Sequence, residues 1–145
     1  YRETGDTVYL EQAKSIADFL LRHPRLPDDL VPYWDYDAPG IPGEPRDASS
    51  AAIMASALIE LSGFVPREQR GTYLQPAIRM LNTLSSPAYR NRGSQNGPFL
   101  LLHSVGSKPQ NSEVDVPLTY ADYYYLEALI RLKKVLREEK TAGKK

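Results

Sequence analysis

The segment from Ala48 to Leu61 constrains the fold most, because it is predicted to be a helix with almost no polar face. Either Asp47 or Ser49 can cap its first turn, and Ser62-Gly63 ends it. A helix that is apolar on all sides must be buried. Its many alanines allow close approach of neighbouring helices, which favours an inner layer of helices. Its apolar residues are Ala48, Ala51, Ala52, Ile53, Met54, Ala55, Ala57, Leu58, Ile59 and Leu61.

Two other helices are predicted from apolar residues spaced three and four apart. One starts after Asp6, a candidate N-cap, carries this spacing through Leu10–Leu21 and ends at His23-Pro24. The other covers Tyr73–Leu84 and is amphipathic, with Pro76 either in its first turn or at a kink. We expect this amphipathic helix to form an outer layer against the apolar one.

A last helix is predicted from Tyr120 to about Glu139, with apolar residues along one side. Thr119 followed by Asp122 resembles a capping box at its start. Lys140–Lys145 are expected to form a frayed tail. The predicted fold class is therefore all-α.

Long irregular segments separate these helices. Pro24–Pro45 contains six prolines and is predicted to be a stiff loop. Ser86–Pro98 is rich in turn residues, and Phe99–His103 is expected to be extended. Ser104–Pro117 is polar and contains glycine, proline and asparagine, so we expect a second long loop. Loops longer than about 12 to 15 residues are uncommon unless they bind or catalyse something.

The number of helices leaves two architectures open. The apolar helix needs cover on every side, yet only three other long helices are predicted. Either the four make a bundle around it, or the chain is part of a larger helical ring. Simple bundles prefer connections of roughly 2 to 8 residues, so the two long loops favour the ring.

Composition excludes several classes of function. A length of 145 residues fits one domain, and 18 basic against 18 acidic residues leave no positive field for nucleic acid. No apolar run approaches the roughly 18 residues that a bilayer requires, and Tyr1–Gly5 does not resemble a signal peptide, so we expect a soluble chain. The absence of cysteine excludes disulfides, thiolate metal sites and a cysteine nucleophile.

An aromatic and acidic cluster in the first long loop is compatible with a carbohydrate cleft. Trp34, the only tryptophan, lies between Tyr33 and Tyr36 and is followed by Asp35 and Asp37. Aromatic faces stack on sugar rings, and carboxylates accept hydrogen bonds from hydroxyl groups. The alternative is structural: the aromatic rings plug the base of the loop and the aspartates cap turns.

The remaining polar residues give no catalytic constellation. Asp47 and Asp122 stand at helix starts and are interpreted as structural. His103 and His23 have no spacing that indicates a metal site, and we expect no metal. His23 at a helix end can bond the last carbonyls. The run Tyr123–Tyr125 is predicted to contribute at least one ring to the core.

Three motifs together resemble one family, the unsaturated glucuronyl hydrolases of glycoside hydrolase family 88. The motifs are VPYWDYDAPGIPGEPRDASSAAIMASALIELS, then LLLHSVGS, then EVDVPLTYADYYYLEALIRL. They occur in the family's order and cover nearly the whole chain. The resemblance implies an (α/α)6 barrel, six helical hairpins in a ring, of which residues 1–139 would be the C-terminal part of one catalytic domain and residues 140–145 a disordered tail. The unsaturated rhamnogalacturonyl hydrolases share this barrel and are the nearest alternative.

The resemblance also implies an enzymatic reaction. In this family a carboxylic acid protonates the C4=C5 double bond of a 4,5-unsaturated uronic acid at the end of an oligosaccharide produced by a lyase. Water adds at C5, and the hemiketal collapses to an open keto acid and frees the neighbouring sugar. No cofactor is expected. The family's two catalytic aspartates lie in an N-terminal half whose motifs are absent here, so we assign no catalytic residue and expect the chain alone to be inactive.

The chain is expected to contribute part of the cleft wall. Some members recognise sulfate through S-x-x-S-x-K, and an ungapped alignment places Ser107 and Gln110 at the two serines and Ser112 at the lysine. Lys108 stands in the wrong register, which argues against tight sulfate recognition. The candidate substrate-binding residues are Trp34, His103, Ser107, Gln110 and Ser112.

The expected partners are an unsaturated uronic-acid oligosaccharide and the missing N-terminal half of the barrel, with no nucleic acid and no membrane. The compartment stays open between bacterial cytoplasm and periplasm. Two alternatives to an enzyme segment remain: a non-catalytic helical module that binds sugars or proteins, and a free-standing bundle without a ligand.

Overall fold

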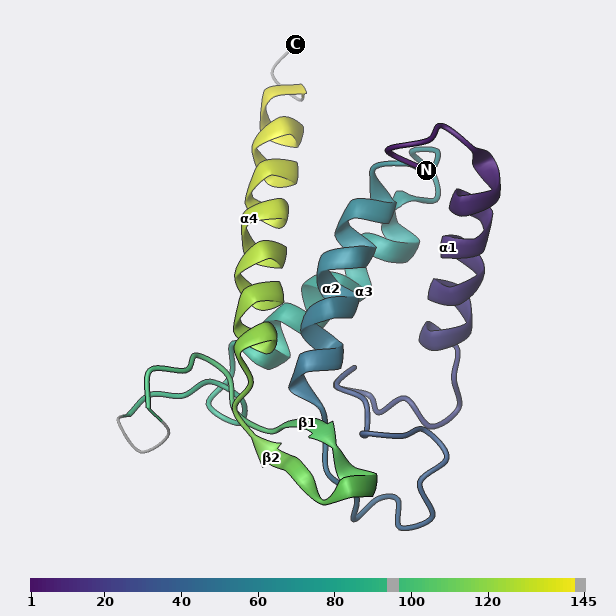
Figure 1. The fold of residues 1–145 in the computed structure, drawn as a ribbon. Coiled ribbons are helices and arrows are strands. Elements are labelled where there is room, and N and C mark those ends of the chain that lie inside the picture. Colours follow the sequence, from purple (N-terminus) through teal and green to yellow (C-terminus); the bar gives the residue numbers. More distant parts are fainter. Residues whose placement is uncertain (94–96, 143–145) are drawn as a thin grey trace.

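The structure is a computed structural model that describes residues 1–93 and 97–142 (Figure 1). Within these residues it contains four α-helices and one β-hairpin. The helices are α1 (Thr7–Leu21), α2 (Ala48–Ser62), α3 (Arg70–Leu84) and α4 (Thr119–Ala142). The hairpin consists of β1 (Ser104–Ser107), the short 3₁₀ helix η2 (Lys108–Gln110) and β2 (Ser112–Val116).

The helices form an open arc with α2 at its centre. α2 packs extensively against both α3 and α4, whereas α1 contacts it less. In Figure 1, α4 and α1 stand at opposite edges of the arc, and the start of α1 and the end of α4 lie at the same end of it. The Pro24–Pro45 segment and the hairpin gather at the other end. The long loops therefore meet on one side of the helical layer.

The inner position predicted for the apolar helix is confirmed. Most of α2 is buried, and its alanines at 48, 51, 52 and 55 are fully inaccessible. The amphipathic α3 covers it with Tyr73, Leu74, Ala77, Met80, Leu81 and Leu84. α3 begins at Arg70 rather than Tyr73, so Pro76 lies inside the helix and not in its first turn.

The arc is not closed, because apolar side chains stay exposed at both edges. On α1 the exposed residues are Val8, Tyr9, Ile16 and Phe19. On α4 they are Tyr120, Tyr123, Leu126, Ile130 and Leu136, with Ile130 69% exposed. Even the central helix has an uncovered position, since Ile53 is 39% exposed. Contiguous exposed apolar surface of this kind marks a face that contacts other protein. A self-contained bundle would cover it.

The prediction that Ser104–Pro117 is a loop is wrong. β1 and β2 pair antiparallel, with Ser104 opposite Val116, Val105 opposite Val114 and Ser107 opposite Ser112, and a bulge follows Ser104. The strands are short and polar and lack a regular apolar alternation, so their sequence carries little strand signal. Their order comes from pairing with each other and from contacts with the start of α2.

The predicted capping box at the start of α4 is also wrong. The carboxylate of Asp122 accepts hydrogen bonds from the backbone N–H groups of Leu100 and Leu101, at 2.8 and 2.9 Å. It thus fixes the segment before the hairpin instead of the helix terminus. In that segment Leu101 forms an isolated antiparallel bridge with Arg90, in agreement with an extended conformation. α4 continues to Ala142, beyond the expected end at Glu139, and residues 143–145 lie outside the described part of the chain.

Among the described residues, no helix combines the length and apolar character required to cross a lipid bilayer.

Asp47 ties the start of α2 to both loop segments. Its carboxylate caps the helix by accepting from the Ser49 N–H at 3.0 Å and from the Ser50 hydroxyl at 2.6 Å. The same carboxylate accepts from the backbone N–H of Val105 in β1, at 3.2 Å. Asp47 is only 6% exposed, so these donors have little access to water as a substitute.

We expect Asp47→Ala to lower the free energy of unfolding by about 2 to 4 kcal/mol, because it removes a helix cap and leaves a buried N–H without an acceptor. The matched control is Asp6→Ala, which removes the exposed cap of α1 and should cost only about 0.5 to 1 kcal/mol. Urea unfolding at low protein concentration measures both. Equal losses in the two variants would contradict the role assigned to Asp47.

Candidate functional site

The Pro24–Pro45 segment is fixed at its two ends so that Trp34 has a defined position. Tyr33 and Arg46 form an isolated antiparallel bridge, and the Trp34 N–H donates to the Pro45 carbonyl at 3.1 Å. The Arg46 guanidinium pairs with Asp29 and lies over the Tyr33 ring, 5.0 Å from its centroid. These contacts therefore join the two ends of the loop, and Trp34 lies next to this junction.

Trp34 belongs to a three-residue cluster that joins this loop to the hairpin. Its indole N–H donates to the carboxylate of Glu44 at 2.8 Å. The Lys108 ammonium lies 3.5 Å from the same carboxylate and 5.7 Å from the centroid of the Trp34 ring. This ring distance is within the range of a cation–π contact. We call these three residues the Trp34 cluster.

Glu44 is closely surrounded within this cluster. Its side chain is only 15% exposed, and a Cβ added at Gly40 would approach its Oε1 to 2.6 Å. The indole N–H of Trp34, and then the charge of Lys108, hold the pKa of the Glu44 carboxyl below its usual value, although partial burial opposes this effect. The ionised carboxylate thus fixes both the tilt of the indole and the direction of the lysine.

The structure brings together the three polar candidates of the hairpin. The Ser107 hydroxyl donates to the side-chain carbonyl of Gln110 across η2, and Ser107 pairs with Ser112 in the strand register. Lys108, the first residue of η2, connects the hairpin to Trp34 and Glu44. All of these residues lie at the tip of the hairpin, next to the loop that carries Trp34.

His103, the remaining candidate, stands at the base of the hairpin. Its Nδ1 lies 2.6 Å from the Asp115 carboxylate of β2, and the Tyr89 ring meets its imidazole edge to face with centroids 6.0 Å apart. The His103 carbonyl accepts from the Ala48 N–H at the start of α2, at 2.9 Å. The candidate residues other than Trp34 are thus distributed along the hairpin from its base to its tip.

Other residues that the sequence singled out have structural positions. Asp35 accepts from the Asp37 N–H at 2.9 Å, as in an Asx turn, and Asp37 faces Arg25. The Tyr36 ring contacts the His23 ring at a tilt of 45°, and burial raises the pKa of the Tyr36 hydroxyl. The Nδ1 atom of His23 accepts from the Arg25 N–H rather than donating to a helix carbonyl, so the expected contact with the last carbonyls is not formed.

The tyrosine run on α4 divides between core and surface. Tyr125 is buried and its hydroxyl lies 2.8 Å from the Ser85 hydroxyl, which confirms that at least one ring packs in the core. Tyr123 is 59% exposed at the open α4 edge. No group of three or more metal-ligating side chains gathers within residues 1–93 and 97–142.

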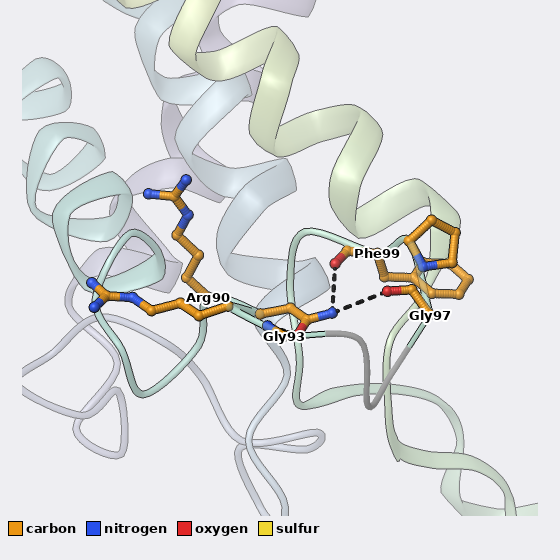
Figure 2. Close-up of a pocket in the computed structure, with 7 residues that line it drawn as sticks. Arg90, Gly93, Gly97 and Phe99 are labelled. Carbon is orange, nitrogen blue, oxygen red and sulfur yellow. Dashed lines mark hydrogen bonds between the residues drawn. The ribbon is translucent and has the colours of Figure 1, made fainter.

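An open pocket of about 510 Å³ lies in the loop that precedes the hairpin (Figure 2). The side-chain amide of Asn91 donates to the carbonyls of Gly97 and Phe99, at 3.3 and 2.9 Å, as Figure 2 shows. Arg90 and Arg92 are also among its lining residues. Sequence reasoning described this stretch only as rich in turns, and none of its residues is among the candidate site residues.

Comparison with known proteins shows which proteins the chain is related to. No protein-family model matches it. It is 48% identical over 136 residues to an unsaturated glucuronyl hydrolase from Formosa agariphila, a match that covers 94% of this chain and 33% of that protein. It is 35% identical to an unsaturated chondroitin disaccharide hydrolase from Streptococcus agalactiae, over 92% of this chain and 33% of that protein.

Solved structures agree with the sequence matches. The structure of an unsaturated glucuronyl hydrolase specific for heparin superposes with a TM-score of 0.91 at 45% identity, over 94% of this chain and 36% of that one. The Streptococcus agalactiae enzyme complexed with dGlcA-GalNAc6S gives a TM-score of 0.82 at 35% identity, over 91% of this chain and 35% of that one.

The chain is homologous to the unsaturated glucuronyl hydrolases. It corresponds to a C-terminal part of their helical barrel and spans about a third of the length of the relatives it matches. The resemblance and the partial barrel predicted from the sequence are thereby confirmed. The open edges of the arc fit this relationship, because the relatives extend well beyond the matched third of their length.

Two contacts of this unsaturated glucuronyl hydrolase homologue were missed by sequence reasoning. Neither Glu44 nor Asp115 is among the candidate residues that the sequence singles out. Glu44 meets Lys108 across 64 positions of sequence (108 minus 44), and no local pattern encodes such a pair. The proximity of Asp115 to His103 depends on the unpredicted hairpin.

We expect the Trp34 cluster to change only when the pH falls below the ordinary pKa of a glutamate carboxyl. Because the folded-state pKa of Glu44 lies below 4.5, its contribution to stability is complete above that pH and is lost as the pH falls through the folded-state value. We expect the emission of Trp34, the only tryptophan, to stay constant from neutral pH down to 4.5 and to change below it. Fluorescence titration measures this directly.

Glu44→Gln should remove this acid transition and show altered emission already at neutral pH. Gly40→Ala should act similarly by displacing the Glu44 carboxylate, whereas Gly71→Ala, where an added Cβ meets nothing within 4 Å, is its control. Glu3→Gln is the control for charge, since Glu3 pairs with Arg2 at the chain start. An unchanged acid transition in Glu44→Gln would contradict the assignment.

Proposed function

We propose that the polypeptide carrying this chain is an unsaturated glucuronyl hydrolase that removes 4,5-unsaturated uronic acid from oligosaccharides produced by a lyase. The supporting observation is the match in sequence and fold over 94% of this chain to enzymes of that name. The reaction protonates the C4=C5 double bond, adds water at C5 and opens the resulting hemiketal, which releases the neighbouring sugar. No residue of this chain is assigned to proton transfer.

In this proposal the described residues build one wall of the substrate cleft. The indole of Trp34 offers an aromatic face to a sugar ring, and Glu44 holds that face in place. Polar side chains of the hairpin, Ser107, Gln110 and Ser112, face sugar hydroxyls next to it. His103 extends this wall along the base of the hairpin.

Lys108 is a poor sulfate ligand in this arrangement. Its ammonium is already neutralised by Glu44, and a sulfate group at the hairpin tip would meet the negative carboxylate. Ser112 stands where the family's sulfate loop carries lysine. These features favour a substrate that is unsulfated, or sulfated at a position away from the hairpin tip.

The partner that completes the site is the N-terminal part of the barrel. The exposed apolar residues of the α1 and α4 edges supply its contact surface. Acidic groups for proton transfer would come from that part. The alternative is a non-catalytic helical module that binds sugar through the Trp34 loop, and the rhamnogalacturonyl hydrolases remain the alternative among enzymes.

The chain on its own should self-associate, because both edges of the arc expose apolar side chains. Light scattering coupled to size exclusion is expected to show species larger than a monomer. Ile130→Gln should reduce the association, whereas Lys134→Gln, one turn further along α4, should not. A monodisperse monomer with a cooperative thermal transition would argue against the incomplete barrel.

Activity should require the N-terminal helices. The polypeptide that contains them is expected to decrease the ultraviolet absorbance of unsaturated disaccharides as it hydrolyses them. The 145-residue chain alone should leave this absorbance unchanged. In the longer polypeptide, Trp34→Ala should raise KM about tenfold, equivalent to about 1.4 kcal/mol of stacking energy. Trp34→Phe retains an aromatic face and should have a smaller effect.

Calorimetric titration with unsaturated disaccharides separates the enzyme from the binding module. Heat of binding without turnover by the longer polypeptide would favour the module. Equal affinity of the wild type and Trp34→Ala would remove the loop from the site. Turnover by the 145-residue chain alone would overturn the assignment of the acidic groups to the N-terminal part.

A further inference from the structure

The contact between His103 and Asp115 has the geometry of an oriented imidazole. The distance of 2.6 Å between Nδ1 and the Asp115 Oδ1 is short for a nitrogen and an oxygen, as in charge-assisted hydrogen bonds. An ionised carboxylate can only accept, so the proton of this bond belongs to Nδ1 of His103. Nε2 is then the nitrogen left for other contacts.

The backbone holds both partners in uncommon conformations. His103 has φ of 62° and Asp115 has φ of 56°, both in the left-handed region that residues other than glycine rarely adopt. Four of the five non-glycine residues with positive φ among the described residues lie from His103 to Asp115. Such conformations strain the backbone and persist where surrounding contacts enforce them.

Those surrounding contacts are present on each side of the pair. The His103 carbonyl accepts from Ala48 at the N-terminus of α2, and Val105 donates to the buried Asp47 carboxylate. On the partner strand, Val114 and Val116, the neighbours of Asp115, pair with β1. The backbone contacts with the start of α2 and between the two strands therefore hold the imidazole and the carboxylate next to each other.

The opposite side of the imidazole is accessible. The His103 side chain is 43% exposed, and within the described part of the chain no hydrogen bond reaches Nε2. β1 leads from His103 to Lys108 of the Trp34 cluster, a length of about 13 Å for its four residues. His103 and the proposed sugar platform thus lie next to the two ends of the same strand.

We infer that Asp115 is a positioning residue that fixes the proton of His103 on Nδ1 and presents Nε2 as the acceptor for a substrate hydroxyl group. This inference rests on the proposed function only for the identity of the ligand. Orientation of an imidazole through its second nitrogen is a recurring device in sites where one tautomer is required. The competing interpretation is that the pair only fastens the two strands.

The tautomer of His103 tests the inference without any enzymatic activity. The chain has only two histidines, so ¹⁵N-histidine labelling gives an Nδ1 and an Nε2 signal from each of two rings, and His23→Gln leaves only the pair of signals from His103. Magic-angle spinning NMR can read these shifts even from self-associated material. At alkaline pH, where the ring is neutral, we expect Nδ1 to carry the proton. A proton on Nε2 in the wild type would overturn the inference.

Asp115→Asn gives the second measurement. The asparagine amide can donate to Nδ1, so the variant should move the proton of His103 to Nε2. Glu113→Gln is the matched control, because Glu113 lies in the same strand with φ of 54° and should leave the tautomer unchanged. An unchanged tautomer in Asp115→Asn would mean that the contact between His103 and Asp115 only stabilises the hairpin.

Kinetics of the longer polypeptide test the substrate contact. Asp115→Asn should raise KM for unsaturated disaccharides about fivefold to tenfold, with Glu113→Gln close to the wild type, and Asp115→Glu should recover part of the loss. If KM does not change in an active polypeptide, the substrate contact is wrong. If the polypeptide has no hydrolase activity, the proposed function fails, while the tautomer still decides whether Asp115 orients His103.

Discussion

The rest of the structure depends on the hydrogen bonds that the buried carboxylate of Asp47 accepts. It caps the helix that forms the centre of the arc, and it accepts from Val105 of the hairpin. The backbone N–H of the same residue donates to Pro32 in the other long loop, at 2.9 Å. One residue at the start of α2 thus connects the inner helix to both segments that form the candidate site. The loops are positioned by the helical layer, although neither belongs to it.

The helical layer could be predicted from the sequence because its signals are local. The apolar run at Ala48–Leu61, the spacing along Leu10–Leu21 and the cap at Asp6 each depend on residues within a few turns of one another. The same counting of helices led to the expectation of an incomplete ring, and the exposure of Ile53 and Ile130 agrees with it. Resemblance to a family supplied the reaction, which no periodicity could have given.

The arrangement of the site could not be predicted, because its contacts join residues far apart in the chain. The sequence singles out Trp34 as an aromatic residue in a candidate binding loop, but the residue that orients it, Glu44, and the residue that connects it to the hairpin, Lys108, show no local pattern. The hairpin itself was taken for a loop, since Gly106 and Asn111 are turn residues and its strands are short. The pairing of His103 with Asp115 became visible only when that hairpin was built.

Two levels of order follow from these contacts. The loops that form the proposed cleft wall are held by ion pairs and hydrogen bonds within this chain, such as those of Glu44, Asp47 and Asp115. The helical edges, in contrast, expose apolar surface that only other helices can cover. In the proposed enzyme, a cleft built in this way would hold the side chains of this wall in place before the barrel closes, and its acidic groups would come from the covering helices. Substrate recognition and proton transfer would then be encoded in different parts of one polypeptide, and substitutions in this wall should change KM before they change the chemical step.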